Sequence, residues 1–178
     1  MTETFTHRLA ETEDLNILTS LMKASISTLQ DPFLNADQVE ASFEVMGLDS
    51  RLIEDKSYFV ILKGETIVGC GGWSRRATLF GGNHTRGRDD ALLDPARDAA
   101  RIRAMYTHPD WTRRGIGRII LNLCEEAARQ ENFQHVELAG TLSGQPLYEA
   151  AGYEAVEFFE AQTSKNINIP LIKMRKSI

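Results

Sequence analysis

The sequence predicts a single mixed α/β domain. Its 178 residues, 42% of them hydrophobic and 25% charged, have the size and balance of one soluble domain with a sizeable core. Segments with the apolar spacing of helices interchange with short aromatic and β-branched segments, in the order β-α-α-β-β-β-α-β-α-β-β. Because no internal repeat, low-complexity tract or linker divides the chain, residues 1–178 are interpreted as one domain.

Two helices are expected after a first strand at residues 5–9. Apolar residues recur at helical spacing from Leu15 to Leu29, and Thr12 is the predicted N-cap of this helix. Asn35 is predicted to cap the second helix, because Gln38 follows three residues later and completes a capping box. This second helix should end near residue 47.

A β-hairpin and a long loop follow. The aromatic and β-branched segments Tyr58–Leu62 and Thr66–Gly69 predict two antiparallel strands, joined by a turn at residues 63–65. Residues 79–99 combine glycines, adjacent aspartates and an Asp-Pro pair with little periodicity, which predicts a loop or insertion. Loops of this length are usually functional or mobile, so the 79–99 segment is also a possible lid.

The second half of the chain alternates strands and helices. A strand at residues 101–107 should stop before Pro109, since proline cannot continue a ladder. An amphipathic helix starts at Ile116 and runs at least to Ala127. The remaining expected elements are a strand at 136–142, a short helix at 143–151 and strands at 153–160 and 169–175.

Charge and cysteine content exclude several classes of function. The net charge of −5 gives no attraction for phosphate backbones or anionic surfaces, which argues against nucleic-acid and membrane partners. The first residues lack the apolar stretch of a secretory signal, so a cytoplasmic location is expected. Cys70 and Cys124 lie far apart and are interpreted as buried small apolar residues, and no metal site is suggested.

The turn before the amphipathic helix has the features of an anion site. Gly115 and Gly117 open the helix, where unpaired backbone N–H groups meet the positive end of the helix dipole. Without a Cβ, these glycines let a pyrophosphate approach the main chain, and Arg113, Arg114 and Arg118 add positive charge around it. The turn therefore suits a diphosphate.

Other interpretations of this turn were weighed. Two glycines at a strand-to-helix turn often give only steric relief, and a basic run is often a solvated surface turn. The dinucleotide fingerprint needs a third glycine where Ile120 stands, and the Gly-Lys-Ser/Thr of a Walker loop does not occur here.

The wider context resembles one enzyme family. The segment from Met105 to Gly117 closely resembles the acetyl-CoA-binding motif of the GNAT superfamily of N-acetyltransferases, except that Thr112 stands where the family has its first Arg or Gln. The segment from Leu147 to Tyr153 resembles the family's C-terminal signature, a tyrosine on a short helix that ends in Gly-Phe or Gly-Tyr. The resemblance implies an α+β GNAT fold, with a central, mostly antiparallel, twisted sheet of about seven strands flanked by helices. It also implies that two strands splay apart to admit acetyl-CoA.

The resemblance further assigns roles to individual residues. The backbone of Met105 and Thr107 would bind the pantetheine arm, and the Met105 amide would hold the oxyanion. Tyr148 would protonate the sulfur of coenzyme A, whereas Tyr153 should belong to the core. Thr141 replaces an asparagine that many relatives carry. The backbone amides expected to surround the pyrophosphate are those of Arg113, Arg114, Gly115, Ile116, Gly117 and Arg118.

The expected function is acetyl transfer from acetyl-CoA to a primary amine of a small molecule or peptide, by direct attack in a ternary complex. No single base stands out, because each of Glu44, Glu54, Asp55, Glu137, His84 and His108 could reach the site or face solvent. A longer acyl donor, or a domain that binds coenzyme A without turnover, are the alternatives. An acidic wall from Glu40, Glu44, Asp89 and Asp90 would favour a cationic polyamine, although scattered solvated carboxylates explain these residues as well. A homodimer is possible, since dimers are common among relatives.

Overall fold

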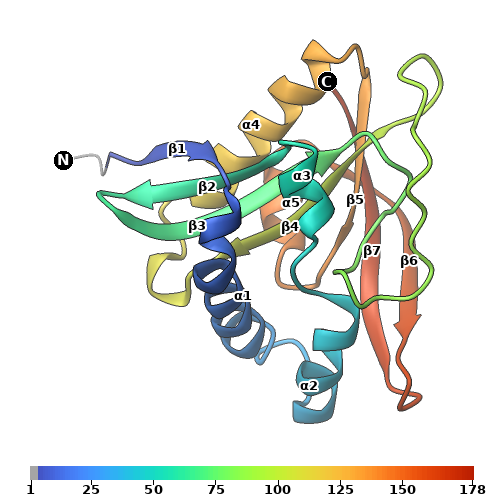
Figure 1. Ribbon diagram of the computed structural model, residues 1–178. Helices are drawn as coiled ribbons and strands as arrows, with labels where there is room; N and C mark the ends of the chain where they lie inside the picture. Colours follow the sequence, from blue (N-terminus) through green and yellow to red (C-terminus); the bar gives the residue numbers. More distant parts are fainter. Residues whose placement is uncertain (1–3) are drawn as a thin grey trace.

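A seven-stranded sheet forms the centre of the molecule in a computed structural model, which describes residues 4–178 (Figure 1). The strand order is β1-β2-β3-β4-β5-β7-β6, with β4 and β5 parallel and the other neighbours antiparallel. The predicted fold class is thus confirmed. The strands are β1 (Thr6–Leu9), β2 (Tyr58–Lys63), β3 (Thr66–Ser74), β4 (Ala100–Thr107), β5 (His135–Gly140), β6 (Glu154–Gln162) and β7 (Asn168–Ser177).

Helices cover both faces of this sheet. In β2, Val60 packs into the cluster beneath α1, whereas the neighbouring Ile61 packs into the cluster beneath α4, as the alternation of a strand requires. The helices are α1 (Leu15–Leu29), α2 (Ala36–Val45), α3 (Ser50–Glu54), α4 (Ile116–Gln130) and α5 (Gln145–Ala150). Within residues 4–178, no helix has the length and apolar character needed to cross a membrane.

The helix starts confirm one prediction and correct another. The Asn35 side chain accepts a hydrogen bond from the Gln38 amide, and the capping box is complete. Thr12, predicted as the first N-cap, lies instead inside a 3-10 turn (Thr12–Asp14) whose cap is Glu11. The prediction was wrong because the Asp14 carboxylate binds the Glu11 amide at 2.8 Å and thereby fixes the start of the turn one residue earlier.

The short helix α3 was not predicted. Asp49 caps it through a hydrogen bond from the Arg51 amide at 3.1 Å. A helix of five residues presents too little of an apolar face to produce a periodic signal.

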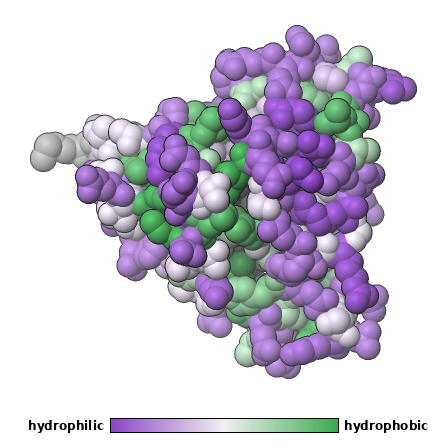
Figure 2. Space-filling view, viewed as in Figure 1, coloured by the Kyte–Doolittle hydropathy of each residue, from purple (hydrophilic) through white to green (hydrophobic). Residues whose placement is uncertain are grey.

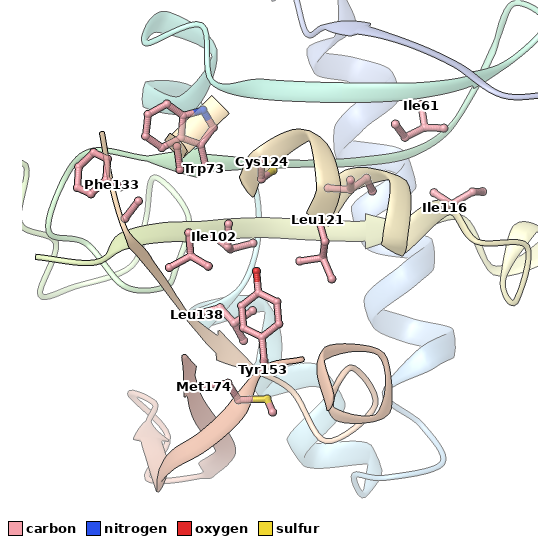
Figure 3. Close-up of a cluster of buried hydrophobic side chains, with 14 of the residues drawn as sticks. Ile61, Trp73, Ile102, Ile116, Leu121, Cys124, Phe133, Leu138, Tyr153 and Met174 are labelled. Carbon is pink, nitrogen blue, oxygen red and sulfur yellow. The ribbon is translucent and has the colours of Figure 1, made fainter. Parts of the chain in front are cut away.

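The larger core cluster lies between α4 and the sheet (Figure 3). Tyr153 is 3% exposed there, and its hydroxyl donates to Glu125 at 3.0 Å, which confirms its predicted core position. Cys70 and Cys124 are also fully buried, as predicted. Burial raises the pKa of the Cys70 thiol to about 12.

Glycines in β3 let α4 approach the sheet closely. A Cβ at Gly69 would lie 2.4 Å from Ile116, and one at Gly71 would lie 2.6 Å from Ile120. Both contacts are too short for any side chain, so the first turns of α4 settle directly onto the β3 backbone. This packing fixes the N-terminus of α4 relative to β4.

The 79–99 segment is held against the rest of the domain by hydrogen bonds. The Thr78 amide binds the Asp89 carbonyl at 2.9 Å, so the segment folds back on itself, as it does at the isolated bridge between Arg76 and Leu92. The Asn83 amide donates to the Leu48 carbonyl at 2.8 Å and anchors the segment beside α2 and α3. Its role as a lid stays a prediction.

Candidate active site: a cavity between diverging strands

The site begins where β4 and β5 separate. Their register pairs Ala100 with Val136 and Arg101 with Glu137, and beyond these residues the edge of β4 up to Thr107 has no partner on β5. The two strands therefore diverge, as the family resemblance implies. Unpaired backbone N–H and C=O groups along this edge are available to an extended ligand that lies beside β4.

A β-bulge interrupts β4 at the same place. Two residues, Ala104 and Met105, stand opposite the single Gly71 of β3, and Ala104 has a left-handed backbone with φ 49°. The buried Tyr58 hydroxyl donates to the Ala104 carbonyl at 2.7 Å and supports this conformation. A bulge changes the direction of the backbone groups that follow, here those of Met105.

A cavity of about 620 Å³ extends from this gap. Its walls come from the C-terminal half of α1, the 45–47 and 79–81 segments, β4, the 111–118 turn and α5. Figure 2 shows hydrophobic surface in the central part of this face of the molecule, with hydrophilic surface over the 79–99 segment to its right. Of the predicted site residues, the structure brings Met105, Thr107, Arg113, Gly115, Ile116, Gly117, Arg118 and Tyr148 together around this cavity.

The turn before α4 presents backbone N–H groups to one end of the cavity. Gly115 is the N-cap of α4 with φ 85°, and Arg113 also has a positive φ of 63°. A glycine N-cap has no side chain to satisfy the first amides of the helix, so those of Ile116, Gly117 and Arg118 point outward unpaired by the helix itself. With the helix dipole behind them, these amides form an anion site.

The three arginines of the turn differ in position. Arg113 and Arg118 line the cavity, and Arg118 also donates to the Ala150 carbonyl of α5 at 2.8 Å. The Arg114 guanidinium instead lies over the ring of Trp111, 4.7 Å from its centroid, and Arg114 is not among the lining residues. The positive charge that faces the cavity at this turn therefore comes mainly from Arg113 and Arg118.

The two glycines of the turn also differ. A Cβ at Gly115 would meet nothing within 4 Å, so glycine is needed there for its left-handed backbone. A Cβ at Gly117 would lie 2.5 Å from the Leu147 side chain. The absence of a side chain at Gly117 therefore also serves the packing of α4 against α5.

Tyr148 projects from α5 toward the cavity. Its ring is enclosed by two glycines, because a Cβ at Gly140 or Gly144 would lie 3.0 or 2.8 Å from its Cε2 atom. Among residues 4–178, no hydrogen bond engages its hydroxyl, which leaves this group available to a ligand. Burial raises the pKa of Tyr148 to about 12, so the phenol remains protonated at neutral pH.

None of the six residues considered as a base lines the cavity. Glu54 and Asp55 form ion pairs with Arg51 and Arg76, and Glu137 contacts three cationic side chains. Glu44 accepts two hydrogen bonds from Ser164. His84 is hydrogen-bonded to the Phe43 carbonyl at 2.6 Å, and His108 accepts from the Asp110 amide at 3.2 Å.

Sequence reasoning missed several residues of the site. Arg103 lines the cavity although it is 3% exposed, and it is bound to Asp49, which is 54 positions away in the sequence. Gln30 at the end of α1 donates to Ser143 at 3.0 Å and closes one wall. No local motif identifies such contacts, because they join segments that only the fold brings together.

The site fits a ligand with a diphosphate at one end and an extended arm. The amides and arginines of the turn suit the diphosphate, and the unpaired edge of β4 suits an amide-containing chain such as pantetheine. These features define the class of proteins that bind coenzyme A between two splayed strands.

Comparison with known proteins gives the family. The sequence profile described as the acetyltransferase (GNAT) family matches residues 22–153, and the chain therefore belongs to this family. Enzymes of this family use acetyl-CoA. No curated protein matches the sequence.

Solved structures share the fold at low sequence identity. A GCN5-related N-acetyltransferase from Rhodopseudomonas palustris superposes with a TM-score of 0.74 and 18% identity, covering 100% of this chain and 98% of the other. The PaiA N-acetyltransferase from Thermoplasma acidophilum, in complex with coenzyme A, superposes with a TM-score of 0.64 and 13% identity, covering 98% of this chain and 99% of the other. The structure of YncA from Salmonella typhimurium with its cofactor acetyl-CoA superposes with a TM-score of 0.64 and 14% identity, covering 98% of this chain and 94% of the other.

Proposed function

We propose that this protein transfers an acetyl group from acetyl-CoA to a primary amine by direct attack, with Tyr148 as the general acid. The observation that supports this most is the position of Tyr148, whose ring packs against two glycines and which lines the same cavity as the 113–118 turn. The turn would bind the diphosphate, and the backbone of Met105 and Thr107 would bind the pantetheine arm. The thioester would then lie near the bulge in β4.

The chemistry needs few groups from the protein. The amine nitrogen forms a bond to the acetyl carbon, the carbon–sulfur bond breaks, and the thiolate takes a proton from Tyr148. The Met105 amide would stabilise the negative charge that develops on the carbonyl oxygen. The nitrogen gives up its extra proton to water, and solvent returns a proton to Tyr148.

The experiment measures free thiol released from acetyl-CoA with a panel of amines. Tyr148→Phe should lower turnover by at least ~10²-fold while the affinity for coenzyme A, measured by calorimetry, changes little. Glu149→Gln is the matched control, because Glu149 is exposed and, among residues 4–178, its side chain is hydrogen-bonded only to Gln145 on the same helix.

Two results would contradict the proposal. Wild-type turnover in Tyr148→Phe would remove this residue from the mechanism. Binding of coenzyme A without thiol release for any amine would instead support a domain that binds the cofactor without turnover. Separately, a higher rate with a longer acyl-CoA than with acetyl-CoA would show that the preferred donor carries a longer acyl chain.

A further inference from the structure

The half of the cavity away from the 113–118 turn is apolar. It lies between α1, the 45–47 segment, the 79–81 segment and β7, and its walls include Ile26, Leu29, Val45, Met46, Phe80 and Leu171. Several of these side chains belong to one hydrophobic cluster with the ends of β6 and β7. We call this region the acceptor half, because it is the space next to Tyr148 that the coenzyme-binding turn does not use.

The part of the chain that the structure describes presents no carboxylate to this space. Among residues 4–178, no Asp, Glu or His lines the cavity, whose ionisable side chains are Arg103, Tyr106, Arg113, Arg118 and Tyr148. The pKa values of both tyrosines are raised by burial, so neither is an anion at neutral pH. A cationic substrate would therefore find no counterion here.

The acidic residues expected to form a wall are engaged elsewhere. Glu40 pairs with Lys165 at 3.1 Å, and Glu44 binds Ser164. Asp89 accepts from the Ala91 amide at 2.9 Å, and Asp90 lies 3.5 Å from Arg51. These contacts leave the acceptor half without the feature that would recognise a polyamine.

The fixed charge nearest to the acceptor half is positive. Arg103 is buried in the cavity wall and shares the carboxylate of Asp49 with Arg88, each at 2.9 Å. Arg88 also lies 4.0 Å from Asp90, but that carboxylate is half exposed and its charge is screened by solvent. Arg103 is further bonded to the carbonyls of Thr78 and Gly81, so its position is fixed. Two guanidinium groups around one carboxylate disfavour any additional cation nearby.

We infer that the acceptor is an apolar primary amine, aliphatic or aromatic, without a second cationic group, and that it enters as the free base. This inference rests on the proposed acetyl transfer and specifies its substrate. An ammonium ion loses its hydration on entering an apolar cavity and gains no counterion, so its burial is unfavourable. The neutral amine leaves its proton in bulk water and arrives ready to attack.

The first test compares amines by thiol release. Hexylamine and 2-phenylethylamine should give kcat/KM values at least ~10-fold above those of hexane-1,6-diamine and spermidine, although the latter carry more amino groups. For hexylamine, KM should fall about tenfold per pH unit from pH 6.5 to 9 while kcat stays nearly constant, because only the free base binds.

Clear outcomes separate this inference from the proposed function. Thiol release that is equally fast or faster with the diamine, or a pH dependence that falls on kcat instead of KM, would overturn the inference and leave acetyl transfer intact. Failure of the proposed function looks different, because no amine in the panel would then release thiol.

A substitution tests the electrostatic reasoning directly. Leu29→Glu places a carboxylate on the α1 wall of the acceptor half and should shift the ratio of kcat/KM values toward hexane-1,6-diamine by about tenfold. Ile17→Glu is the matched control on the same helix, because Ile17 is 52% exposed and does not line the cavity. An equal shift in both variants, or no shift in Leu29→Glu, would count against the inference. The comparison of amines on the unmodified chain tests the inference whether or not Leu29→Glu folds.

Discussion

The enclosure of the Tyr148 ring by glycines predicts the effect of one methyl group. In Gly144→Ala, the new Cβ would lie 2.8 Å from Cε2 and 3.3 Å from Cζ of Tyr148. Ordinary contacts between carbon atoms start at about 3.4 Å, so the ring has to move by roughly 0.6 Å. Gly140 packs against the same edge of the ring. When the ring moves, the hydroxyl that it carries moves with it.

The expected cost falls on turnover and spares folding. A misplacement of about 1 Å at a reacting group lowers the rate on the order of 10²-fold, so Gly144→Ala should lower kcat roughly tenfold. Gly144 has φ −84° and ψ −22°, which alanine adopts without backbone strain, so the entropic gain offsets the cost of the tight contact and the melting temperature should change little. Thiol release, thermal unfolding and calorimetry with coenzyme A measure the three quantities separately.

A double-mutant cycle shows whether the effect acts through the hydroxyl. In the Tyr148→Phe background, Gly144→Ala should change the remaining turnover by less than about twofold, because there is no hydroxyl left to displace. A tenfold loss in both backgrounds would refute this reasoning and indicate that Gly144 acts on another part of the site.

Three further results are expected. Arg113→Ala should weaken coenzyme A binding roughly tenfold in calorimetry, more strongly at low salt, whereas Arg114→Ala should have a smaller effect because Arg114 stacks on the Trp111 ring and does not itself line the cavity. An acid must be protonated to act, and the pKa of Tyr148 is about 12, so kcat should show no alkaline decline up to about pH 10; a decline at lower pH would exclude this tyrosine as the acid. Tyr58→Phe removes the hydrogen bond to Ala104 and should lower the free energy of unfolding by about 1–3 kcal/mol in urea titrations, with weaker coenzyme A binding as the bulge relaxes; unchanged values would show that the bulge does not depend on this bond.

The sequence was sufficient for the parts of the site that are local in the chain. The turn from Arg113 to Arg118 joins a strand to a helix within a few residues, so its glycines and charges are visible as one motif. Tyr148 likewise lies in a short recognisable segment. The element order was also predictable, because long periodic segments determine it.

Contacts between distant segments could not be predicted in this way. Arg103 depends on Asp49, which is 54 positions away in the sequence, and Gln30 on Ser143, which is 113 positions away. Glu40 and Glu44 illustrate the same limit. Their charges are visible in the sequence, but the direction of each side chain is set by the packing of α2 against the 163–165 turn.

The distribution of charge in the cavity is consistent with the absence of a protein base. In the proposed reaction, negative charge develops on the carbonyl oxygen and the sulfur, where the Met105 amide and the protonated Tyr148 would stabilise it. Positive charge develops on the nitrogen, in the acceptor half, where the described residues place no carboxylate in the wall. An amine that has already lost one proton needs to release only one more after attack, and water can accept it. In the proposed reaction, a cavity of this kind would select its acceptor by the cost of removing charge from water, and the fixed positive charge of Arg103 in its wall would contribute to that selection.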